Sequence, residues 1–150
     1  MDDTSPLRRT RRSLPIALLR ARETVMGPLR EMLASSGITE QKWRVLRVLQ
    51  ESGPLELGQI ASEACLLLPS LTRMVPPMVT EGLIARHTPP QDRRKVVLTI
   101  TPAGEALILA HAARSAAILS RIDAQFGKDQ LEQLLDLLET LQALDLRGPD

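Results

Sequence analysis

The sequence predicts a mainly α-helical fold with one small β-hairpin (α+β). Two observations support this class: apolar residues recur at three- and four-residue steps along most of the chain, and two short β-prone runs lie between residues 83 and 100. A chain of 150 residues that is 43% hydrophobic can bury one core. We therefore expect a single domain over residues 14–146, preceded by a flexible, Arg-rich arm over residues 1–13.

Three helices are expected before residue 65. Residues 14–33 carry apolar side chains at three- and four-residue steps, the pattern of a helix with one buried face. Thr39 is a suitable N-cap for a second helix over residues 40–50, which Ser52-Gly53-Pro54 ends. A short third helix follows over about residues 57–64.

A fourth helix follows Pro69 and ends at Gly82, since glycine adopts the left-handed backbone of a helix C-cap. Its buried side is expected to hold Leu71, Met74, Val75 and Met78. Pro76 and Pro77 each remove a backbone donor, so we expect the helix to kink or tighten there and base readout to be concentrated in its first turns.

The rest of the chain predicts a hairpin and two helices. Residues 83–88 and 95–100 are the β-prone runs, and a six-residue loop joins them. Thr101-Pro102 begins a fifth helix that runs to about Phe126. Gly127 interrupts it, and a leucine-rich sixth helix covers residues 131–146.

This order of elements has a physical logic. Helices three and four form a helix-turn-helix, and the hairpin is its wing, which gives a lobe over residues 39–100. The helices over residues 14–35 and 101–146 are too long for this lobe to cover, and their leucine and alanine faces need a partner. We therefore expect these helices to build a homodimer.

The placement of charge, rather than its sum, points to a polyanionic partner. With 19 Lys and Arg against 18 Asp and Glu, the formal net charge is only +1. The hairpin nevertheless holds Arg86, Arg93, Arg94 and Lys95 beside one acid, Asp92. A cationic hairpin tip suits a narrow minor groove, where negative potential is concentrated. A solvated turn is the alternative interpretation.

The outward stripe of the fourth helix adds Ser70, Arg73 and Pro77. Arg is well suited to bidentate contact with guanine, and a hydroxyl can serve a base edge or a phosphate. A solvated face is the alternative here. Together, the helix and the hairpin predict a protein that binds double-stranded DNA.

Four residues are candidates for a small-molecule site. Arg22 has apolar neighbours one turn away in each direction, and a buried guanidinium needs an anion. This anion is either a ligand carboxylate or an acid across a dimer interface, such as Glu23 or an acid of the partner's last helix. Trp43 and Arg47 could hold an aromatic acid, although a lone Trp more often belongs to the core. Cys65 could sense oxidants, but the leucines that follow it favour a buried core or pocket position.

Several classes of function are not expected. The chain has no glycine-rich phosphate loop, no metal-spaced Cys/His cluster and no nucleophile motif, so we predict no enzyme, cofactor or metal. The single cysteine and the absence of an apolar signal segment favour the cytoplasm. No apolar run is long enough to cross a membrane. A protein-interaction module that does not bind DNA remains a competing class.

The chain resembles the multiple-antibiotic-resistance regulator (MarR) family, and within it the branch that regulates homoprotocatechuate degradation. The matching strings cover nearly all of residues 14–144. They are Leu18-Leu19-Arg20-Ala21-Arg22-Glu23, Thr39-Glu40-Gln41-Lys42-Trp43-Arg44-Val45-Leu46-Arg47, Pro69-Ser70-Leu71-Thr72, Gly82-Leu83-Ile84, Asp92-Arg93-Arg94 through Leu98-Thr99, and Gly104.

The resemblance implies a dimeric winged-helix repressor that leaves a pseudo-palindromic operator when a small aromatic acid binds between the DNA lobe and the dimer base. It implies that Ser70, Thr72 and Arg73 face bases and phosphates, that Arg94 enters the minor groove, and that Asp92 holds its guanidinium. A redox-responsive or ligand-independent regulator is the alternative within the family.

Overall fold

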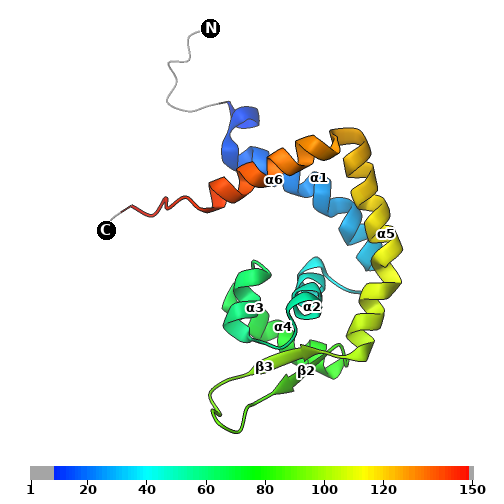
Figure 1. Cartoon of the computed structure of the whole chain (residues 1–150), viewed down its shortest axis with the longest axis vertical. Coiled ribbons are helices and arrows are strands. Elements are labelled where there is room, and N and C mark those ends of the chain that lie inside the picture. The colour runs from blue at the N-terminus through cyan, green and yellow to red at the C-terminus, as the bar shows by residue number, and fades with distance from the viewer. Residues whose placement is uncertain (1–8, 149–150) are drawn as a thin grey trace. The chain divides into compact units, whose positions relative to one another are not determined.

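The computed structural model describes residues 9–148, which divide into two compact units after Ala113. The first unit contains four helices, the sheet and the first half of α5, and the second contains the rest of α5 and α6 (Figure 1). The mainly α-helical class with a small antiparallel sheet is confirmed. Residues 1–8 of the predicted arm lie outside the described residues, and Thr10–Arg12 forms a 3₁₀ turn, η1.

The helices lie close to their predicted positions. They are α1 (Leu14–Ala34), α2 (Glu40–Ser52), α3 (Leu57–Glu63), α4 (Leu68–Thr80), α5 (Pro102–Phe126) and α6 (Lys128–Gln142). The strands are β1 (Leu55–Glu56), β2 (Ile84–His87) and β3 (Val97–Ile100).

Local chemistry explains several of these boundaries. The Thr39 hydroxyl accepts a hydrogen bond from the Lys42 amide at 3.2 Å and caps α2. Gly82 has a φ of 76° and follows α4, as predicted for a left-handed C-cap. At the start of α5, the Thr101 hydroxyl accepts from the Gly104 amide at 3.1 Å and donates to the Gly82 carbonyl. Thr101 thereby ties the end of one helix to the start of the next.

The hairpin is part of a three-stranded antiparallel sheet with the order β1-β3-β2. Arg86 pairs with Leu98 between β2 and β3, and Leu55 pairs with the same residue from β1. The sequence did not predict β1, because a two-residue strand is too short to show alternation. Both hairpin strands are shorter than expected, so the wing loop extends from residue 88 to residue 96.

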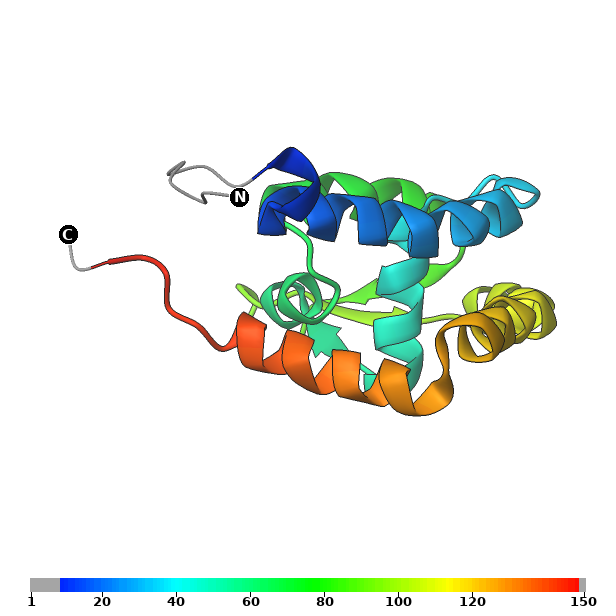
Figure 2. The same ribbon diagram turned by 90° about the horizontal axis from the view of Figure 1, so that it is seen from above.

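The core of the first unit lies where α2 contacts α1, α3 and β3. Figure 2 shows α2 running across the direction of α1. The fully buried side chains of this core are Met32, Leu33, Val45, Leu46, Leu49, Ile60, Leu71, Val75, Met78, Ile84 and Leu98. This core fixes the rotation of α4 and the position of the wing strands.

The second unit leaves its apolar side chains largely uncovered. No residue of α6 is buried, and Leu134, Leu135 and Leu137 are all exposed. In the first unit, Leu18, Leu19 and Val25 of α1 are exposed as well. Among residues 9–148, no helix is both long enough and apolar enough to span a bilayer.

Candidate nucleic-acid interface and effector site

The outer face of α4 is set by what the helix buries. Leu71, Val75 and Met78 point into the core, so Thr72 and Arg73 are exposed and Ser70 is half-buried at the first turn. The Thr72 hydroxyl donates to the Leu68 carbonyl at 2.9 Å. Its proton is therefore already used, and the hydroxyl offers an acceptor to an incoming group.

Pro76 and Pro77 neither break α4 nor tighten it into another helix type, because Leu68–Thr80 is one continuous α-helix. An interior proline costs about 3 kcal/mol relative to alanine, mainly through the lost N–H and the clash with the carbonyl four residues back. The carbonyls concerned belong to Thr72 and Arg73, both exposed residues that water can reach. The helix therefore does not tighten into another helix type. A kink at the prolines, and base readout confined to the first turns, stay predictions.

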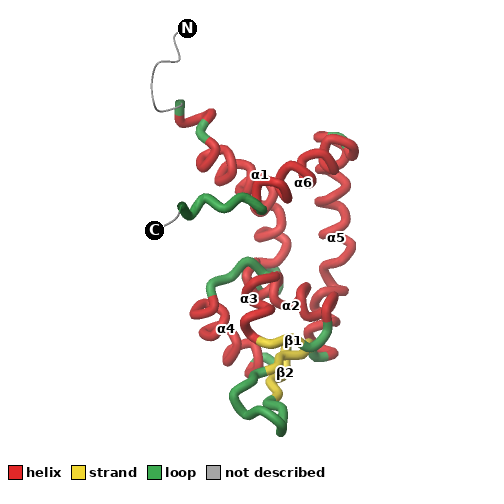
Figure 3. Tube along the Cα trace, turned by 60° about the vertical axis from the view of Figure 1, so that its left-hand side comes forward, coloured by secondary structure: helices red, strands yellow, loops and turns green. Residues whose placement is uncertain are grey.

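The wing presents cations without acidic partners. Arg86 on β2 and Arg93 and Arg94 in the loop are exposed. Within the described part of the chain, neither these three nor Arg73 has a carboxylate within 4.0 Å. Figure 3 shows the wing loop extending beyond the strands at the end of the unit that also holds α4. These guanidiniums are available to phosphates and bases.

Asp92 acts on the backbone rather than on a guanidinium. Its Oδ1 accepts a hydrogen bond from the Arg94 amide at 3.0 Å. This is the local turn that a short carboxylate forms with the amide two residues on. The expectation that Asp92 holds the Arg94 guanidinium is thus wrong for this structure, and Asp92 instead shapes the loop that carries Arg94.

Lys95 differs from its neighbours because it has a partner. Its Nζ lies 3.4 Å from Glu56 Oε1, at the N-cap of α3. The pair ties the base of the wing to β1 and partly neutralises Lys95. Similarly, Lys42 Nζ lies 3.0 Å from Glu81 at the end of α4.

Arg22 lies on a face of α1 that is uncovered in the single chain, so its place in a buried seam between subunits stays a prediction. Its side chain is 50% exposed, because Leu18, Leu19 and Val25 around it are themselves uncovered. Its Nη2 lies 2.5 Å from Glu40 Oε1 of the same chain, whereas Glu23 pairs with Arg30. The acid that pairs with Arg22 within this chain is therefore Glu40, which the sequence did not indicate, and not Glu23.

Glu40 is the functional candidate that sequence reasoning missed. Its side chain is only 7% exposed, and its Oε2 has no hydrogen-bond partner among the described residues. Arg30 Nη1 lies 3.9 Å from this oxygen. The pKa of Arg30 is raised, mainly because its guanidinium also donates a hydrogen bond to Glu23. A glutamate in the first turn of a helix is ordinary, so its position gave no signal.

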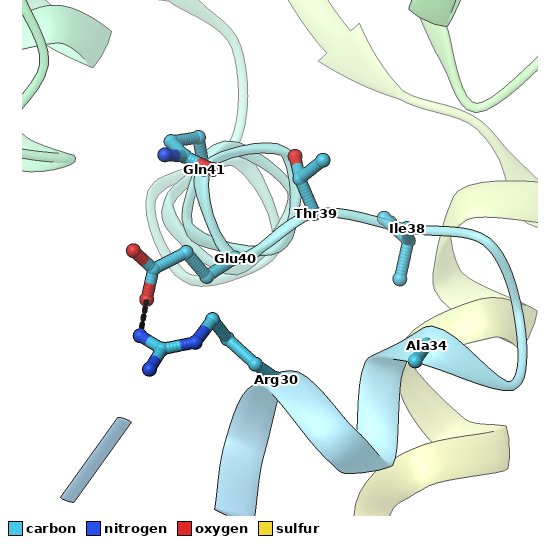
Figure 4. Close-up of a pocket in the computed structure, with 6 residues that line it drawn as sticks. All are labelled: Arg30, Ala34, Ile38, Thr39, Glu40 and Gln41. Atoms are coloured by element: carbon cyan, nitrogen blue, oxygen red, sulfur yellow. Dashed lines mark ion pairs between the residues drawn. The ribbon is translucent and has the colours of Figure 1, made fainter. Parts of the chain in front are cut away.

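Glu40 lies at the wall of an open pocket of 240 Å³. Figure 4 shows the pocket between the end of α1 and the start of α2, with the Arg30 and Glu40 side chains facing each other. The lining residues are Arg30, Ala34, Ile38, Thr39, Glu40 and Gln41. None of the four predicted ligand residues lines this pocket. In the described residues, no group of His, Cys, Asp and Glu could hold a metal ion.

Trp43 packs against a buried histidine. The Trp43 and His111 rings meet edge to face with centroids 5.9 Å apart, and His111 Nε2 lies 2.8 Å from the Ser36 hydroxyl. Arg47 does not join Trp43, because its guanidinium bonds Gln50 and Glu51 along its own helix. Glu40, Trp43 and Arg47 nevertheless share one face of α2 at spacings of three and four residues.

Cys65 is exposed, so the prediction of a buried thiol is wrong. It lies in the turn between α3 and α4 with a φ of 53°, and the exposed Leu67 and Leu68 do not cover it. Arg44 donates to the Ala64 carbonyl at 2.8 Å and to the Cys65 carbonyl at 3.3 Å, which holds the turn in place.

Comparison with known proteins gives consistent matches over most of the chain. A sequence profile of the MarR family matches residues 38–96. The homoprotocatechuate degradative operon repressor of Escherichia coli is 39% identical over 132 residues, which cover 88% of this chain and 89% of the relative. The transcriptional regulator FarR of Neisseria gonorrhoeae is 35% identical over 133 residues, covering 89% and 91%.

Among solved structures, NadR in complex with 4-hydroxyphenylacetate superimposes with a TM-score of 0.80 at 33% identity. The match covers 94% of this chain and all of NadR. The helices, the small sheet and their order are therefore shared with a structure that contains an aromatic carboxylate.

Proposed function

This chain belongs to the MarR family of transcriptional regulators, and from that premise we propose that it is a homodimeric repressor that binds a pseudo-palindromic operator in the cytoplasm and is released by a small aromatic carboxylate. Its relatives are regulators of transcription, so it is not an enzyme. The observation that carries the proposal is the set of exposed arginines on α4 and the wing that have no acidic partner within residues 9–148.

The proposed division of labour follows from burial. The lobe over residues 39–100 has its own core and offers Ser70, Thr72 and Arg73 to the major groove. The wing would contact phosphates and the minor groove through Arg86 on β2 and through Arg93 and Arg94 in the loop, where the Asp92 turn positions Arg94. The helices over residues 14–35 and 101–146 leave apolar side chains exposed that a second copy would bury.

Competition binding tests DNA recognition directly. We expect a selected operator duplex to bind at least about 1,000-fold more tightly than bulk competitor DNA. The logarithm of affinity should fall linearly with the logarithm of salt concentration, because phosphate contacts release counterions. A protein-interaction module would show neither sequence preference nor a steep salt dependence, and that result would reject the proposal.

The effector site is proposed on the face of α2 that holds Glu40, Trp43 and Arg47, with Arg22 reaching it from α1. The half-exposed Arg22 guanidinium keeps donors for a ligand carboxylate, and the unpartnered Glu40 Oε2 can accept from a phenol hydroxyl. 4-Hydroxyphenylacetate carries a carboxylate for the first of these contacts and a hydroxyl for the second. Cys65 was a predicted ligand residue, but nothing in the geometry brings it to this face.

Thermal shift with matched ligands tests the effector site. At 100 times its Kd, 4-hydroxyphenylacetate should stabilise the native protein by about 2.7 kcal/mol, with a higher Tm. Phenylacetate, which lacks the hydroxyl, should bind more weakly because it leaves Glu40 Oε2 without a hydrogen bond. Arg22→Ala should abolish the shift, while Arg20→Ala, an exposed arginine of the same helix, should retain it. Equal shifts in both variants would remove Arg22 from the site.

The exposure of Cys65 favours a second candidate, a regulator that responds to oxidants. Peroxide should then weaken operator binding by the native protein but not by Cys65→Ser. Equal loss in both proteins, or no loss in either, would leave the aromatic carboxylate as the proposed signal.

A further inference from the structure

The outer face of α4 carries two prolines that no described residue of the first unit buries. Pro76 and Pro77 are exposed, while Val75 and Met78 beside them are buried. Three- and four-residue spacing places both prolines on the same face as Arg73, one turn further along the helix. Any operator contact made by Arg73 therefore brings the prolines to the same groove.

This turn of α4 offers no hydrogen-bond donor to a base. The proline rings have no N–H, and the neighbouring Val79 is apolar and 36% exposed. In the major groove, guanine, cytosine and adenine present only donors and acceptors, whereas thymine also presents a methyl group. The thymine methyl is the one apolar group on a base edge that an apolar turn can cover.

From this match we propose that Pro76 and Pro77 are specificity-determining residues that select thymine by apolar contact with its 5-methyl group. The inference rests on the proposed function and adds the base that this turn reads. It replaces the expectation that base readout is confined to the first turns of α4. A helical rise of about 1.5 Å per residue places the prolines about 4.5–6 Å beyond Arg73 along the helix axis. In a helix lying along the groove, the thymine falls within about two base pairs of the position that Arg73 contacts.

Replacing single thymines with deoxyuridine tests the proposal. The operator is first selected from random duplexes, and each thymine is then changed to uracil, which keeps every hydrogen bond and removes only the methyl group. One symmetric position in each half-site should lose about fourfold in affinity, the value for uncovering one methyl-sized group. Pro76→Ala, Pro77→Ala or the double variant should lose this sensitivity.

Pro28→Ala provides the matched control, since Pro28 is an interior proline of α1, far from α4 in sequence, and its replacement should leave the uracil profile unchanged. Both kinds of variant remove a helix-breaking residue and should fold. Specific operator binding without any uracil-sensitive position would overturn the inference and leave the proposed function intact, as would a sensitivity that persists in the double variant. Absence of any preferred duplex would overturn both.

Discussion

The Gly104→Ala variant is expected to unfold at a much lower urea concentration than the native protein. Gly104 lies in the first turn of α5, where a Cβ atom would stand 2.3 Å from the Leu83 carbonyl oxygen and 2.8 Å from Ile100 Cγ1. The first of these neighbours is backbone at the junction of α4 and β2, so it cannot turn aside. Overpacking of this kind costs about 3 kcal/mol.

Gly58→Ala is the matched control for this prediction. Gly58 also lies in the first turn of a helix, α3, but a Cβ atom there would meet nothing within 4 Å. Alanine should therefore stabilise the protein by about 0.5–1 kcal/mol, because it reduces the freedom of the unfolded chain. If the two variants had the same urea midpoint, the close contact between α5 and the wing base would be refuted.

Arg94→Ala is expected to weaken operator binding by about 1–3 kcal/mol, or roughly 5- to 150-fold. Arg94 is exposed, has no acidic partner among the described residues and is carried by a loop that Asp92 fixes. Among residues 9–148, no carboxylate therefore competes with DNA for its guanidinium. Fluorescence anisotropy at one fixed salt concentration measures the effect.

A Lys95→Ala variant distinguishes a specific DNA contact of Arg94 from a general loss of positive charge in the wing. Lys95→Ala removes the same formal charge from the same loop, but Lys95 already pairs with Glu56. We expect it to cost less than about 1 kcal/mol, the range of an exposed ion pair. Equal losses in the two variants would show that the wing contributes only charge, and an unchanged affinity in Arg94→Ala would remove the wing from the mechanism.

The fold was predictable because residues next to several helix ends mark those ends by their own chemistry. Thr39, Gly82 and Thr101 act through hydrogen bonds or a left-handed backbone within a few residues, so the sequence contains the information locally. The buried side of α4 was equally readable from its spacing. By contrast, β1 forms by pairing with β3, about forty residues later, and a two-residue strand has no period of its own.

The site was less predictable because its side chains bind residues of other helices and loops, far away in the sequence. The acid bound by Arg22 is Glu40, eighteen residues away, and periodicity cannot rank one acid over another. Cys65 was expected to be buried because leucines follow it, but Leu67 and Leu68, at the start of α4, are exposed and so is the thiol. Asp92 was assigned to a guanidinium, although the amide two residues on is closer to a short carboxylate.

The central claim is that two copies of this chain present two α4 helices and two wings to one duplex. The most direct test is sedimentation of the protein with its selected operator, combined with a footprint of the bound duplex. The account predicts two subunits per duplex and protection of two inverted half-sites whose centres lie about 10 base pairs apart. A single subunit bound to an asymmetric site would contradict it.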